Sequence, residues 1–588
     1  MMKKNKKIKT DNNVSLIRMI KAIWGIKLPW LHLILYVVAM AGTMVGSLLM
    51  AGATGDMVDA AGNIATATLI SFSAAYIVIG AGSTLSTIFS GLAGERINVA
   101  LREKLWRKLM YIPQKYYDTD GGETLVSRIT TDCDFASALI VTVIGIVTAV
   151  FSLFGYLTSM LAMNMQITLA IFVVIPVSVI VGVLFGKAKY ALGRKTQAAL
   201  ANTTYYLIER TKNLPLIKVS NMSNVENEKG KAAFEEQCKM DIRTGYLSVT
   251  YNVIDTALSI TGILITFILG ASLVEQCVMT TGDVIAFYSI SGMVTLSFAN
   301  LINSCGTVRH AIGSMSRVVT AMETESEDTA KGNNMDIPNE DIRFENVTFG
   351  YTDAPVLTDL SCVIPKNKVT AIIGANGSGK TTMFKLLERM YDPDKGFIYF
   401  GEAYANSFSL FAWRKAFGLV SQDRPVLEGT LRENITYGCE RDISDEELWQ
   451  VAKMANLEEL VKSLPDGFDT KVAPGGRNFS GGQCQCIAIA RAIMHNPDYL
   501  LLDEATSSLD VKSEKIVTDA LHTLMEGRTT VIIAHSLSAI RHADNVLVLK
   551  DGKITACGSP ADIIKTSEDY QTFVTSQKYT PMACKINS

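Results

Sequence analysis

The stretch Gly374-Ala375-Asn376-Gly377-Ser378-Gly379-Lys380-Thr381 decides the fold of the C-terminal half of this 588-residue chain. It fits the pattern G-x-x-x-x-G-K-[ST] and directly follows the apolar run of residues 369–373. A strand that ends in a glycine-rich turn and opens a helix directs backbone N–H groups and a helix N-terminus toward one polyanion. The stretch therefore predicts a phosphate-binding loop for a nucleoside triphosphate.

Two side chains of this loop predict its chemistry. Lys380 can reach the β- and γ-phosphates as a point charge, and the Thr381 hydroxyl can ligate Mg²⁺. The alternative, an ordinary glycine-rich turn, is disfavoured because both residues stand where the pattern requires them. The residues expected to contact the nucleotide are Gly374, Asn376, Gly377, Ser378, Gly379, Lys380, Thr381 and Thr382.

The composition divides the chain into two regions with different solvents. Hydrophobic residues make up 48% of it, which is high for a soluble protein, and the first half holds long uncharged stretches. The second half has short apolar runs between charged segments, as in a soluble α/β domain. The net charge of −2 argues against a general nucleic-acid-binding protein, which usually carries a strong basic excess.

Six segments of the first half are apolar enough and long enough to cross a bilayer. The connections 51–67, 164–166 and 275–283 contain no lysine or arginine, whereas the connections 95–135 and 187–255 are rich in both. Because positive charge resists translocation, we expect the basic connections and both termini in the cytosol. The predicted spans are residues 31–50, 68–94, 136–163, 167–186, 256–274 and 284–305.

The inner connections are longer than turns require, and apolar residues recur at helical spacing between Ile97 and Leu109. We expect the helices to continue into the cytosol. The helical pattern is interrupted at residues 118–122 and 213–215, within tips around 116–124 and 208–218. Such tips can contact a cytosolic domain; simple surface turns are the alternative.

Asp255 stands at the inner end of the fifth predicted span. An ionisable group inside a membrane usually faces the interior of the helix bundle or a water-filled cavity, so Asp255 is a candidate for substrate contact. The other interpretation, solvation at the level of the lipid headgroups, is the one we favour on sequence alone. Ten cysteines predict no disulfide framework, because all but Cys277 fall in stretches that we place in or near the cytosol.

Two further apolar runs of the second half end in polar residues. Residues 499–503 read as a buried strand that ends in Asp503 and Glu504, and residues 530–534 lead to His535. Because ligands of parallel sheets bind at the carboxyl ends of the strands, these residues are expected beside the phosphate loop. Asp503 can hold Mg²⁺ through water, and Glu504 can act as general base on the attacking water. Each ending alone would usually be structural, but together they predict a hydrolytic site.

The motif Phe479-Ser480-Gly481-Gly482-Gln483 lies between the loop and these strand ends. With it, the chain resembles the ATP-binding cassette (ABC) transporters, and over nearly its full length an exporter-type half-transporter with six spans and one nucleotide-binding domain. The resemblance implies ATP as the nucleotide. It also assigns the remaining roles: Ser480 to Gln483 as the signature motif, Tyr351 as the aromatic that stacks on adenine, Gln422 as the glutamine that joins Mg²⁺ to the membrane domain, Ser508-Leu509-Asp510 as the D-loop, and His535 as the switch histidine.

In this family the signature of one chain closes over the triphosphate held by another chain. The residues agree with that scheme, because Ser480, Gly481 and Gly482 open the helical run 483–493, whose N–H groups and dipole can address the γ-phosphate. The resemblance therefore implies a second half-transporter, as a homodimer or a heterodimer. ATP would join the nucleotide-binding domains, hydrolysis would release them, and the tips near Tyr117 and Leu216 would pass this motion to the spans.

One departure from the family concerns Cys484 and Cys486, which stand where the family commonly has arginines. A Cys-x-Cys metal site is disfavoured, because residues two apart on a helix point in different directions and no further ligands lie nearby. The favoured consequence is altered charge near the start of the helix.

The expected fold class is a multi-domain membrane protein, with an all-α six-helix transmembrane domain followed by an α/β P-loop ATPase domain with a helical subdomain. The expected function is an ATP hydrolase that drives export of an amphipathic small molecule, lipid or peptide across the plasma (inner) membrane, among membrane lipids and without nucleic acid. Two alternatives stay open: an exporter-shaped importer of a metal chelate such as a siderophore, and an ATP-gated channel or regulatory subunit. A leader-processing peptide exporter is disfavoured, because no peptidase-like segment precedes the first span.

The expected divisions are a cytosolic basic segment (1–30), the transmembrane domain (31–322), a linker (323–340), the nucleotide-binding domain (341–575) and a tail (576–588).

Overall fold

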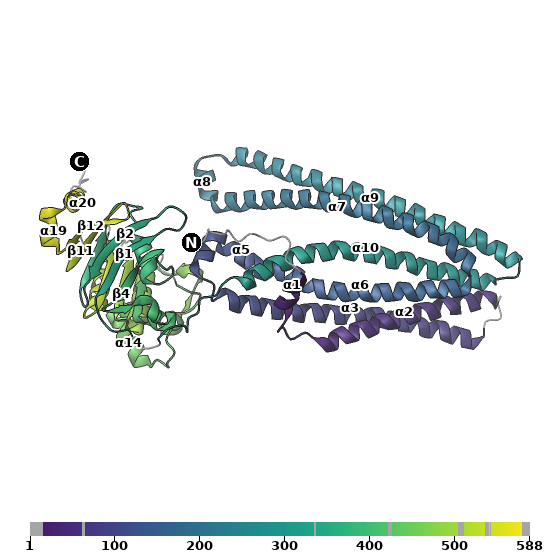
Figure 1. Ribbon diagram of the computed structural model, residues 1–588, viewed down its shortest axis with the longest axis horizontal. Helices are drawn as coiled ribbons and strands as arrows, with labels where there is room; N and C mark the ends of the chain where they lie inside the picture. The colour runs from purple at the N-terminus through teal and green to yellow at the C-terminus, as the bar shows by residue number, and fades with distance from the viewer. Residues whose placement is uncertain are drawn as a thin grey trace. The chain divides into compact units, whose positions relative to one another are not determined.

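The computed structural model describes residues 16–60, 65–333, 337–421, 426–503, 511–534, 540 and 543–578 (Figure 1). The chain divides into two compact units. The helical unit extends to Met110 and resumes at Gly122–Thr324, and the α/β unit combines Tyr111–Gly121 with the chain from Glu325 onward. A short segment between two long helices thus belongs to the α/β unit.

Long helices build the helical unit, and six helices in the described part of the chain are long and apolar enough to cross a bilayer. α7 and α9 lie side by side, and α8 connects their ends (Figure 1). Each predicted span lies within one long helix, and the prolongations predicted beyond the spans are helical. The elements are α1 (Leu16–Ile23), α2 (Trp30–Asp59), α3 (Thr66–Leu109), α5 (Gly122–Ser127), the π-helical turn η1 (Arg128–Asp132), α6 (Cys133–Met163), α7 (Met165–Lys212), α8 (Leu214–Val219), α9 (Ser223–Glu275) and α10 (Thr281–Glu323).

The expectation of an outer loop over residues 51–67 is wrong for its first part, because α2 continues to Asp59. Packing against the start of α10 explains the extra turns. A Cβ atom on Gly55 would lie 2.8 Å from the carbonyl oxygen of Gly282, so two glycines allow the backbones to approach. The Asp59 carboxylate then accepts a hydrogen bond of 2.7 Å from the backbone N–H of Gly282 near the N-terminus of α10.

The predicted break at residues 118–122 is placed too early. Helix α4 (Gln114–Asp120) includes Asp118, and the helical conformation ends at Gly121, whose φ of +75° suits glycine. Asp118 stays helical because its carboxylate accepts a hydrogen bond from the side chain of Gln114, one turn earlier. The second break is confirmed, since α7 ends at Lys212 and Pro215 stands in the first turn of α8, where proline is tolerated.

Two main sheets build the α/β unit. The antiparallel sheet has the order β2-β1-β4-β5, and the larger sheet has the order β12-β11-β3-β10-β9-β6, parallel except for β12. The strands are β1 (Ile342–Phe349), β2 (Leu357–Ile364), β3 (Val369–Ile373), β4 (Lys395–Phe400), β5 (Ala403–Tyr404), β6 (Phe417–Val420), β9 (Tyr499–Asp503), β10 (Thr529–Ile533), β11 (Asn545–Lys550) and β12 (Lys553–Gly558), with β7 (Gly429–Thr430) and β8 (Lys471–Val472) as a separate pair.

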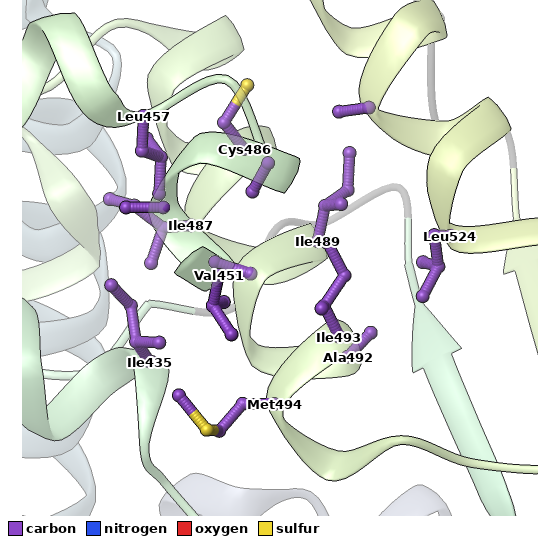
Figure 2. Close-up of a cluster of buried hydrophobic side chains, with 14 of the residues drawn as sticks. Ile435, Val451, Leu457, Cys486, Ile487, Ile489, Ala492, Ile493, Met494 and Leu524 are labelled. Atoms are coloured by element: carbon purple, nitrogen blue, oxygen red, sulfur yellow. The ribbon is translucent and has the colours of Figure 1, made fainter. Parts of the chain in front are cut away.

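Helices cover these sheets and enclose two large apolar clusters. In one cluster, a buried face of α16 packs against Ile435, Val451, Leu457 and Leu524 (Figure 2). In the other, the rings of Phe400 and Trp413 meet edge to face at 4.5 Å between centroids. The helices are α11 (Lys380–Leu387), α12 (Leu410–Ala416), α13 (Leu431–Ile435), α14 (Asp445–Met454), α15 (Glu458–Ser463), α16 (Gly481–His495), α17 (Val511–Met525), α19 (Pro560–Thr566) and α20 (Glu568–Lys578), with short 3₁₀ turns at Ala405–Ser407, Gly467–Asp469 and Pro474–Gly476.

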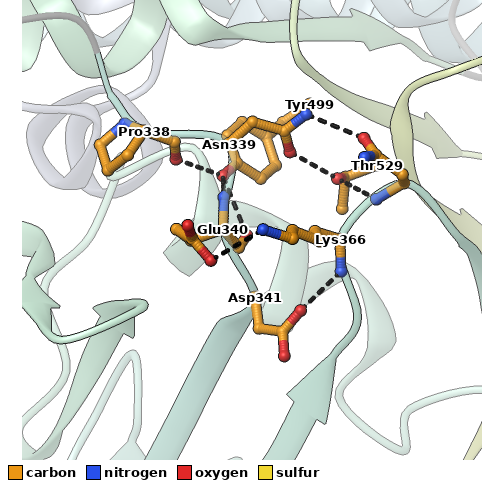
Figure 3. A network of polar contacts seen from close by, with 8 residues as sticks. Pro338, Asn339, Glu340, Asp341, Lys366, Tyr499 and Thr529 are labelled. Atoms are coloured by element: carbon orange, nitrogen blue, oxygen red, sulfur yellow. Dashed lines mark hydrogen bonds and ion pairs between the residues drawn. The ribbon is translucent and has the colours of Figure 1, made fainter.

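A polar network holds the chain that enters the first strand (Figure 3). The Tyr499 hydroxyl accepts a hydrogen bond from the backbone N–H of Glu340 at 2.8 Å and donates to the carbonyl of Pro338 at 2.8 Å. The Asp341 carboxylate accepts from the backbone N–H of Lys366 at 2.8 Å. Because Tyr499 is the first residue of β9, this network anchors the entering chain at the end of the strand opposite to Asp503.

Candidate nucleotide-binding site

Four neighbouring parallel strands end at one edge of the larger sheet. Ile533 pairs with Ile372 and with Asp503, and Val420 pairs with Leu502. The phosphate loop follows β3 at this edge, and Asp503 is the last residue of β9. The predicted residues Gln422, Glu504 and His535 follow the ends of β6, β9 and β10 within two positions, but they and Asp510 lie outside the described residues.

The backbone of the phosphate loop requires its glycines. Gly374, Gly377 and Gly379 have φ angles of +158°, +82° and +107°. A Cβ atom on Gly374 would lie 2.1 Å from the carbonyl oxygen of Leu549, and one on Gly379 would lie 2.6 Å from the Leu357 side chain. At Gly377 a Cβ atom would meet nothing within 4 Å, so this glycine presents bare backbone toward open space.

The polar side chains of the loop suit a triphosphate. The Lys380 ammonium is buried and donates to the carbonyls of Gly374 and Ala375 at 2.8 and 3.1 Å. The Ser378 hydroxyl is also buried and has no hydrogen-bond partner among the described residues. Thr381 is exposed in the first turn of α11. A cation, an unsatisfied hydroxyl and a helix N-terminus form a donor set for a polyanion, and the oxygens of Thr381 and Asp503 are the kind of ligand that Mg²⁺ prefers.

Tyr351 lies in an aromatic group beside this loop. Its ring centroid is 5.2 Å from that of Phe349 and 5.3 Å from that of Tyr391, both nearly edge to face. Its hydroxyl donates to Thr382 Oγ1 at 3.3 Å. The ring is therefore held next to the first turn of α11.

The signature motif forms the start of α16, two residues earlier than predicted. Helix α16 begins at Gly481 and not at Gln483, because Ser480 and Gln483 form a capping box. The Ser480 N–H donates to Gln483 Oε1 at 2.8 Å, and the Gln483 N–H donates to Ser480 Oγ at 3.2 Å. The box uses two N–H groups of this terminus, so Gly481 and Gly482 are the residues whose N–H groups can address an anion.

The two cysteines that depart from the family pattern are buried structural residues. Cys484 Sγ lies 3.6 Å from the carbonyl oxygen of Gly476, and Cys486 belongs to the apolar cluster of Figure 2. Burial raises the pKa of the Cys486 thiol to about 12, so this thiol is poorly reactive. Within the described ranges, no group of three or more metal-ligating side chains is present.

Comparisons with known proteins agree with this geometry. Residues 30–298 match the family model described as ABC transporter transmembrane region, and residues 357–507 match the model described as ABC transporter. The chain belongs to the ABC transporter family. The "Multidrug resistance ABC transporter ATP-binding and permease protein" of Lactococcus lactis is 34% identical over 86% of this chain and 86% of that protein. The "Mitochondrial potassium channel ATP-binding subunit" of Mus musculus is 33% identical over 82% of this chain and 68% of that protein. The "ATP-dependent lipid A-core flippase" of Thiobacillus denitrificans is 29% identical over 84% of this chain and 86% of that protein.

This ABC transporter is an exporter-type half-transporter, in which a six-span membrane region is fused to one nucleotide-binding domain. It is a multi-pass membrane protein that couples ATP hydrolysis to transport. The resemblance stated from the motifs and the predicted fold class are thereby confirmed.

One group of contacts in the half-transporter escaped the sequence analysis. Asp118 of α4 accepts hydrogen bonds from the Tyr391 hydroxyl at 2.6 Å and from Gln114 Nε2 at 2.9 Å, and it pairs with Lys385 at 3.3 Å. Lys385 belongs to α11, and its ammonium lies 5.3 Å from the ring centroid of Tyr351. Asp118 is thus two contacts away from the predicted adenine-binding ring.

Charge and hydrogen bonding keep Asp118 ionised. Partial burial acts to raise the pKa of this carboxyl, but the hydrogen bonds from Tyr391 and Gln114 and the charge of Lys385 outweigh it and hold the pKa below its ordinary value. The sequence contained a signal for this contact, an acid at a tip expected to meet a cytosolic domain. It contained none for the partners, which lie 267 and 273 residues away.

Glu388, which follows the last residue of α11, is a second residue that the sequence pattern did not indicate. Burial, together with the negative charge of Asp503, raises the pKa of Glu388 to about 7, against the opposing charges of Lys385 and Arg414. The carboxyl therefore titrates near neutral pH, close to the end of β9 where Mg²⁺ is expected.

This pKa predicts a pH-dependent stability. A carboxyl whose pKa is raised on folding stabilises the fold only while it is protonated, so its contribution is lost as the pH rises from about 4.5 to about 7. Glu388→Gln should leave the melting temperature near wild type at pH 5 and raise the free energy of unfolding by about 1–3 kcal/mol at pH 8. Scanning fluorimetry of the full chain in EDTA measures this difference, with exposed Glu402→Gln as control. A Glu388→Gln effect equal at both pH values would contradict the assignment.

Proposed function

We propose that two copies of this half-transporter, or one copy and a related chain, form an exporter of the plasma (inner) membrane. The nucleotide-binding domains and both termini face the cytosol, and an amphipathic small molecule, lipid or peptide moves outward. The convergence of four parallel strand ends on the phosphate loop is the observation that carries the proposal. The absence of lysine and arginine from the three predicted outer connections supports the orientation.

The hydrolytic roles follow from the strand ends. ATP with Mg²⁺ supplies the scissile phosphoanhydride when bound. Lys380 and the N–H groups of the loop hold the phosphates, and Thr381 and Asp503 provide oxygen ligands for the metal, with Gln422 as a further ligand. Glu504 removes a proton from the attacking water, and His535 completes the polar edge beside the γ-phosphate.

The start of α16 supports a dimer. Its capping box fixes Gly481 and Gly482 at a helix N-terminus, and glycines leave these N–H groups accessible to a large anion. In the proposed complex this terminus contacts the triphosphate bound by the other chain, with Asp510 at the same junction. Neither chain then completes a site alone, so ATP joins the two domains.

The contacts of Asp118 support mechanical coupling between the nucleotide and the spans. α4 lies between α3 and α5 in the chain. Its residue Asp118 pairs with Lys385 of α11, the helix that follows the phosphate loop. A movement of α11 that follows ATP binding or hydrolysis is therefore passed to α4 and to the two helices that continue it.

Asp118→Asn should uncouple hydrolysis from transport. The substitution removes the charge that attracts Lys385, which costs a partly exposed contact about 1 kcal/mol and lowers the ratio of docked to undocked α4 about fivefold. Transport per ATP hydrolysed should fall measurably, by at most about fivefold, while basal hydrolysis stays within about twofold of wild type. The charge-exchanged variant Asp118→Lys with Lys385→Asp should recover part of the transport. Equal losses of hydrolysis and transport in Asp118→Asn would contradict a coupling role.

The direction of transport is tested in proteoliposomes with the nucleotide-binding domains facing the bath. ATP added outside should drive a fluorescent amphipathic cation or lipid into the vesicle lumen, which corresponds to export from a cell. ATP-dependent accumulation in vesicles whose nucleotide-binding domains face the lumen would instead support an importer. The names of the relatives from Lactococcus lactis and Thiobacillus denitrificans favour export of multiple drugs or of a lipid.

A second candidate function is favoured by the similarity to the mitochondrial potassium channel ATP-binding subunit of Mus musculus. A channel subunit would gate a passive flux without moving a solute uphill. The two functions separate in the same vesicles: a pump builds a gradient that scales with ATP consumed, whereas a gate only speeds equilibration of potassium and builds none.

A further inference from the structure

The first 30 residues carry an excess of positive charge, although the whole chain has a net charge of −2. Asp11 is their single acid. Their basic residues are Lys3, Lys4, Lys6, Lys7, Lys9, Arg18, Lys21 and Lys27. We call residues 3–27 the basic segment. A cluster of this kind directly before a membrane span is typical of a segment that meets anionic lipid headgroups.

Helix α1 gives part of this segment an apolar and a basic face. Leu16, Met19 and Ile23 recur at intervals of three and four residues, and Arg18 and Lys21 are three apart on another face. Met19 is buried, whereas Arg18 and Lys21 are exposed. A helix with this division of faces suits the boundary between a membrane and water, with its charges toward the headgroups.

Contacts with two long helices fix α1 in place. The Arg18 guanidinium donates two hydrogen bonds, of 3.2 and 2.5 Å, to the carboxylate of Glu323, the last residue of α10. The Lys104 ammonium of α3 donates to the carbonyls of Ala22 and Trp24 at 2.7 and 3.0 Å, where the end of a helix favours a cation. α1 also packs against α10 (Figure 1). The position of α1 is therefore set by the fold.

The remaining charges of this region have no counter-charge in the protein. Lys21 and Lys27 are exposed, and within the described ranges neither has a hydrogen-bond or ion-pair partner. Acids at the inner ends of the helices are engaged elsewhere: Glu323 pairs with Arg18, and Asp134 pairs with Arg102 at 2.6 Å. The two lysines are thus available to a partner outside the chain.

Asp255, at the inner end of the fifth predicted span, also has other surroundings. It lines a cavity of about 210 Å³ between α7, α9 and α10, together with Tyr251 and Tyr288. The preference for simple solvation of Asp255 at the headgroup level, drawn from the sequence, is corrected by this position.

Two exposed tryptophans place the basic segment beside the bilayer surface. Trp24 is 79% exposed and Trp30 is 65% exposed, and Trp30 is the first residue of α2, directly before the predicted span. Tryptophan is enriched at the boundary between lipid and water. Lys27 is three residues from Trp30, at most about 10 Å along the chain, which is close to one Debye length at physiological salt.

We propose that the basic segment binds anionic phospholipids, with Lys21 and Lys27 on the phosphate groups and the two tryptophans among the acyl chains near the headgroups. The positive charge supplies attraction and selects against zwitterionic lipids, whose headgroups carry no net charge. Because α1 is fastened to α3 and α10, the lipid occupies a defined place on the half-transporter and is not merely part of the surrounding bilayer.

The test compares phosphatidylglycerol with phosphatidylcholine of identical acyl chains. Each lipid is titrated into the detergent-solubilised full-length protein, and bound lipid is counted by native mass spectrometry. Wild type should bind phosphatidylglycerol about tenfold more tightly, and Lys21→Gln with Lys27→Gln should weaken that binding about tenfold without changing phosphatidylcholine. Equal affinities of the two lipids for wild type, equal weakening of both, or no change in the variant would overturn the proposal.

Two further variants separate charge at this place from charge in general. Lys453→Gln with Lys565→Gln removes two exposed lysines of the α/β unit and should change neither lipid. If Lys21→Gln with Lys27→Gln is poorly folded, Lys21→Arg with Lys27→Arg replaces it and should keep the preference for phosphatidylglycerol. Loss of the preference in this charge-retaining variant would count against the proposal.

The occupant is tested with glycerophosphoglycerol, the same headgroup without acyl chains. At equal concentration it should not displace phosphatidylglycerol, because the tryptophans require apolar chains. Displacement would show that a free phosphate ester is the ligand and would overturn the lipid.

The titration contains no ATP and detects lipid on either side of the protein, so its result does not depend on the direction of transport. A lysine-dependent preference for phosphatidylglycerol without ATP-driven transport would leave this interaction standing and overturn the exporter function. Transport by a protein without that preference would leave the exporter standing and overturn the interaction.

Discussion

Glu504→Gln is expected to lower ATP hydrolysis by about 10²- to 10⁴-fold, the usual size of a general-base contribution, and to leave ATP binding close to wild type. Glu504 directly follows Asp503, the last residue of β9. Asp503 pairs with Ile533, the last residue of β10. The amide of glutamine keeps the size of the side chain but cannot accept the proton of the attacking water.

The measurement is steady-state phosphate release by the purified full-length protein in lipid, together with a titration of a fluorescent ATP analogue. Exposed Glu526→Gln serves as control and should retain wild-type turnover. Because hydrolysis releases the proposed dimer, the Glu504→Gln protein should also remain associated in the presence of ATP. Turnover near wild type in this variant would show that another residue is the base.

Lys380→Ala is expected to weaken ATP binding by about 10- to 100-fold, since a hydrogen-bonded charge on a phosphate contributes about 1.5–3 kcal/mol. The buried ammonium also donates to the carbonyls of Gly374 and Ala375, so the substitution removes contacts within the loop as well. Lys380→Arg tests geometry separately, because its planar guanidinium retains the charge but presents donors in a different arrangement.

Equilibrium binding of ATP, with and without Mg²⁺, measures this effect. Lys368→Ala, which removes an exposed lysine just before β3, is the matched control and should bind as wild type does. A Lys380→Ala affinity equal to that of wild type would refute the phosphate role of this residue.

Local patterns in the sequence were sufficient for much of this architecture. The phosphate loop needs glycine where φ is positive, as at Gly377 and Gly379, and the sequence has glycine at both positions. The strand that ends at Asp503 and the long apolar helices have equally local signatures, a short apolar run and about 20 uncharged residues. Their positions agree with the structure because backbone conformation and burial in lipid depend mainly on neighbouring residues.

Patterns of this kind were insufficient where an element ends against a distant partner. α2 continues to Asp59 because Gly282 lies against Gly55, and α16 begins at Gly481 because Gln483 folds back on Ser480. The capping box was readable in the sequence, from serine followed three residues later by glutamine. The contact between α2 and α10 was not, since the residues are more than 200 positions apart.

The sequence by itself determined the family, the glycine-rich loop after β3 and the six candidate spans of the described residues, because each depends on residue types at short and regular spacing. The tertiary structure decided the surroundings of Asp118, Glu388 and Asp255. An isolated carboxylate has the same local pattern whether it is solvated, paired or buried. Its partners, Tyr391 and Lys385 for Asp118, Asp503 for Glu388 and the aromatic cavity wall for Asp255, come together only when distant helices and strands pack.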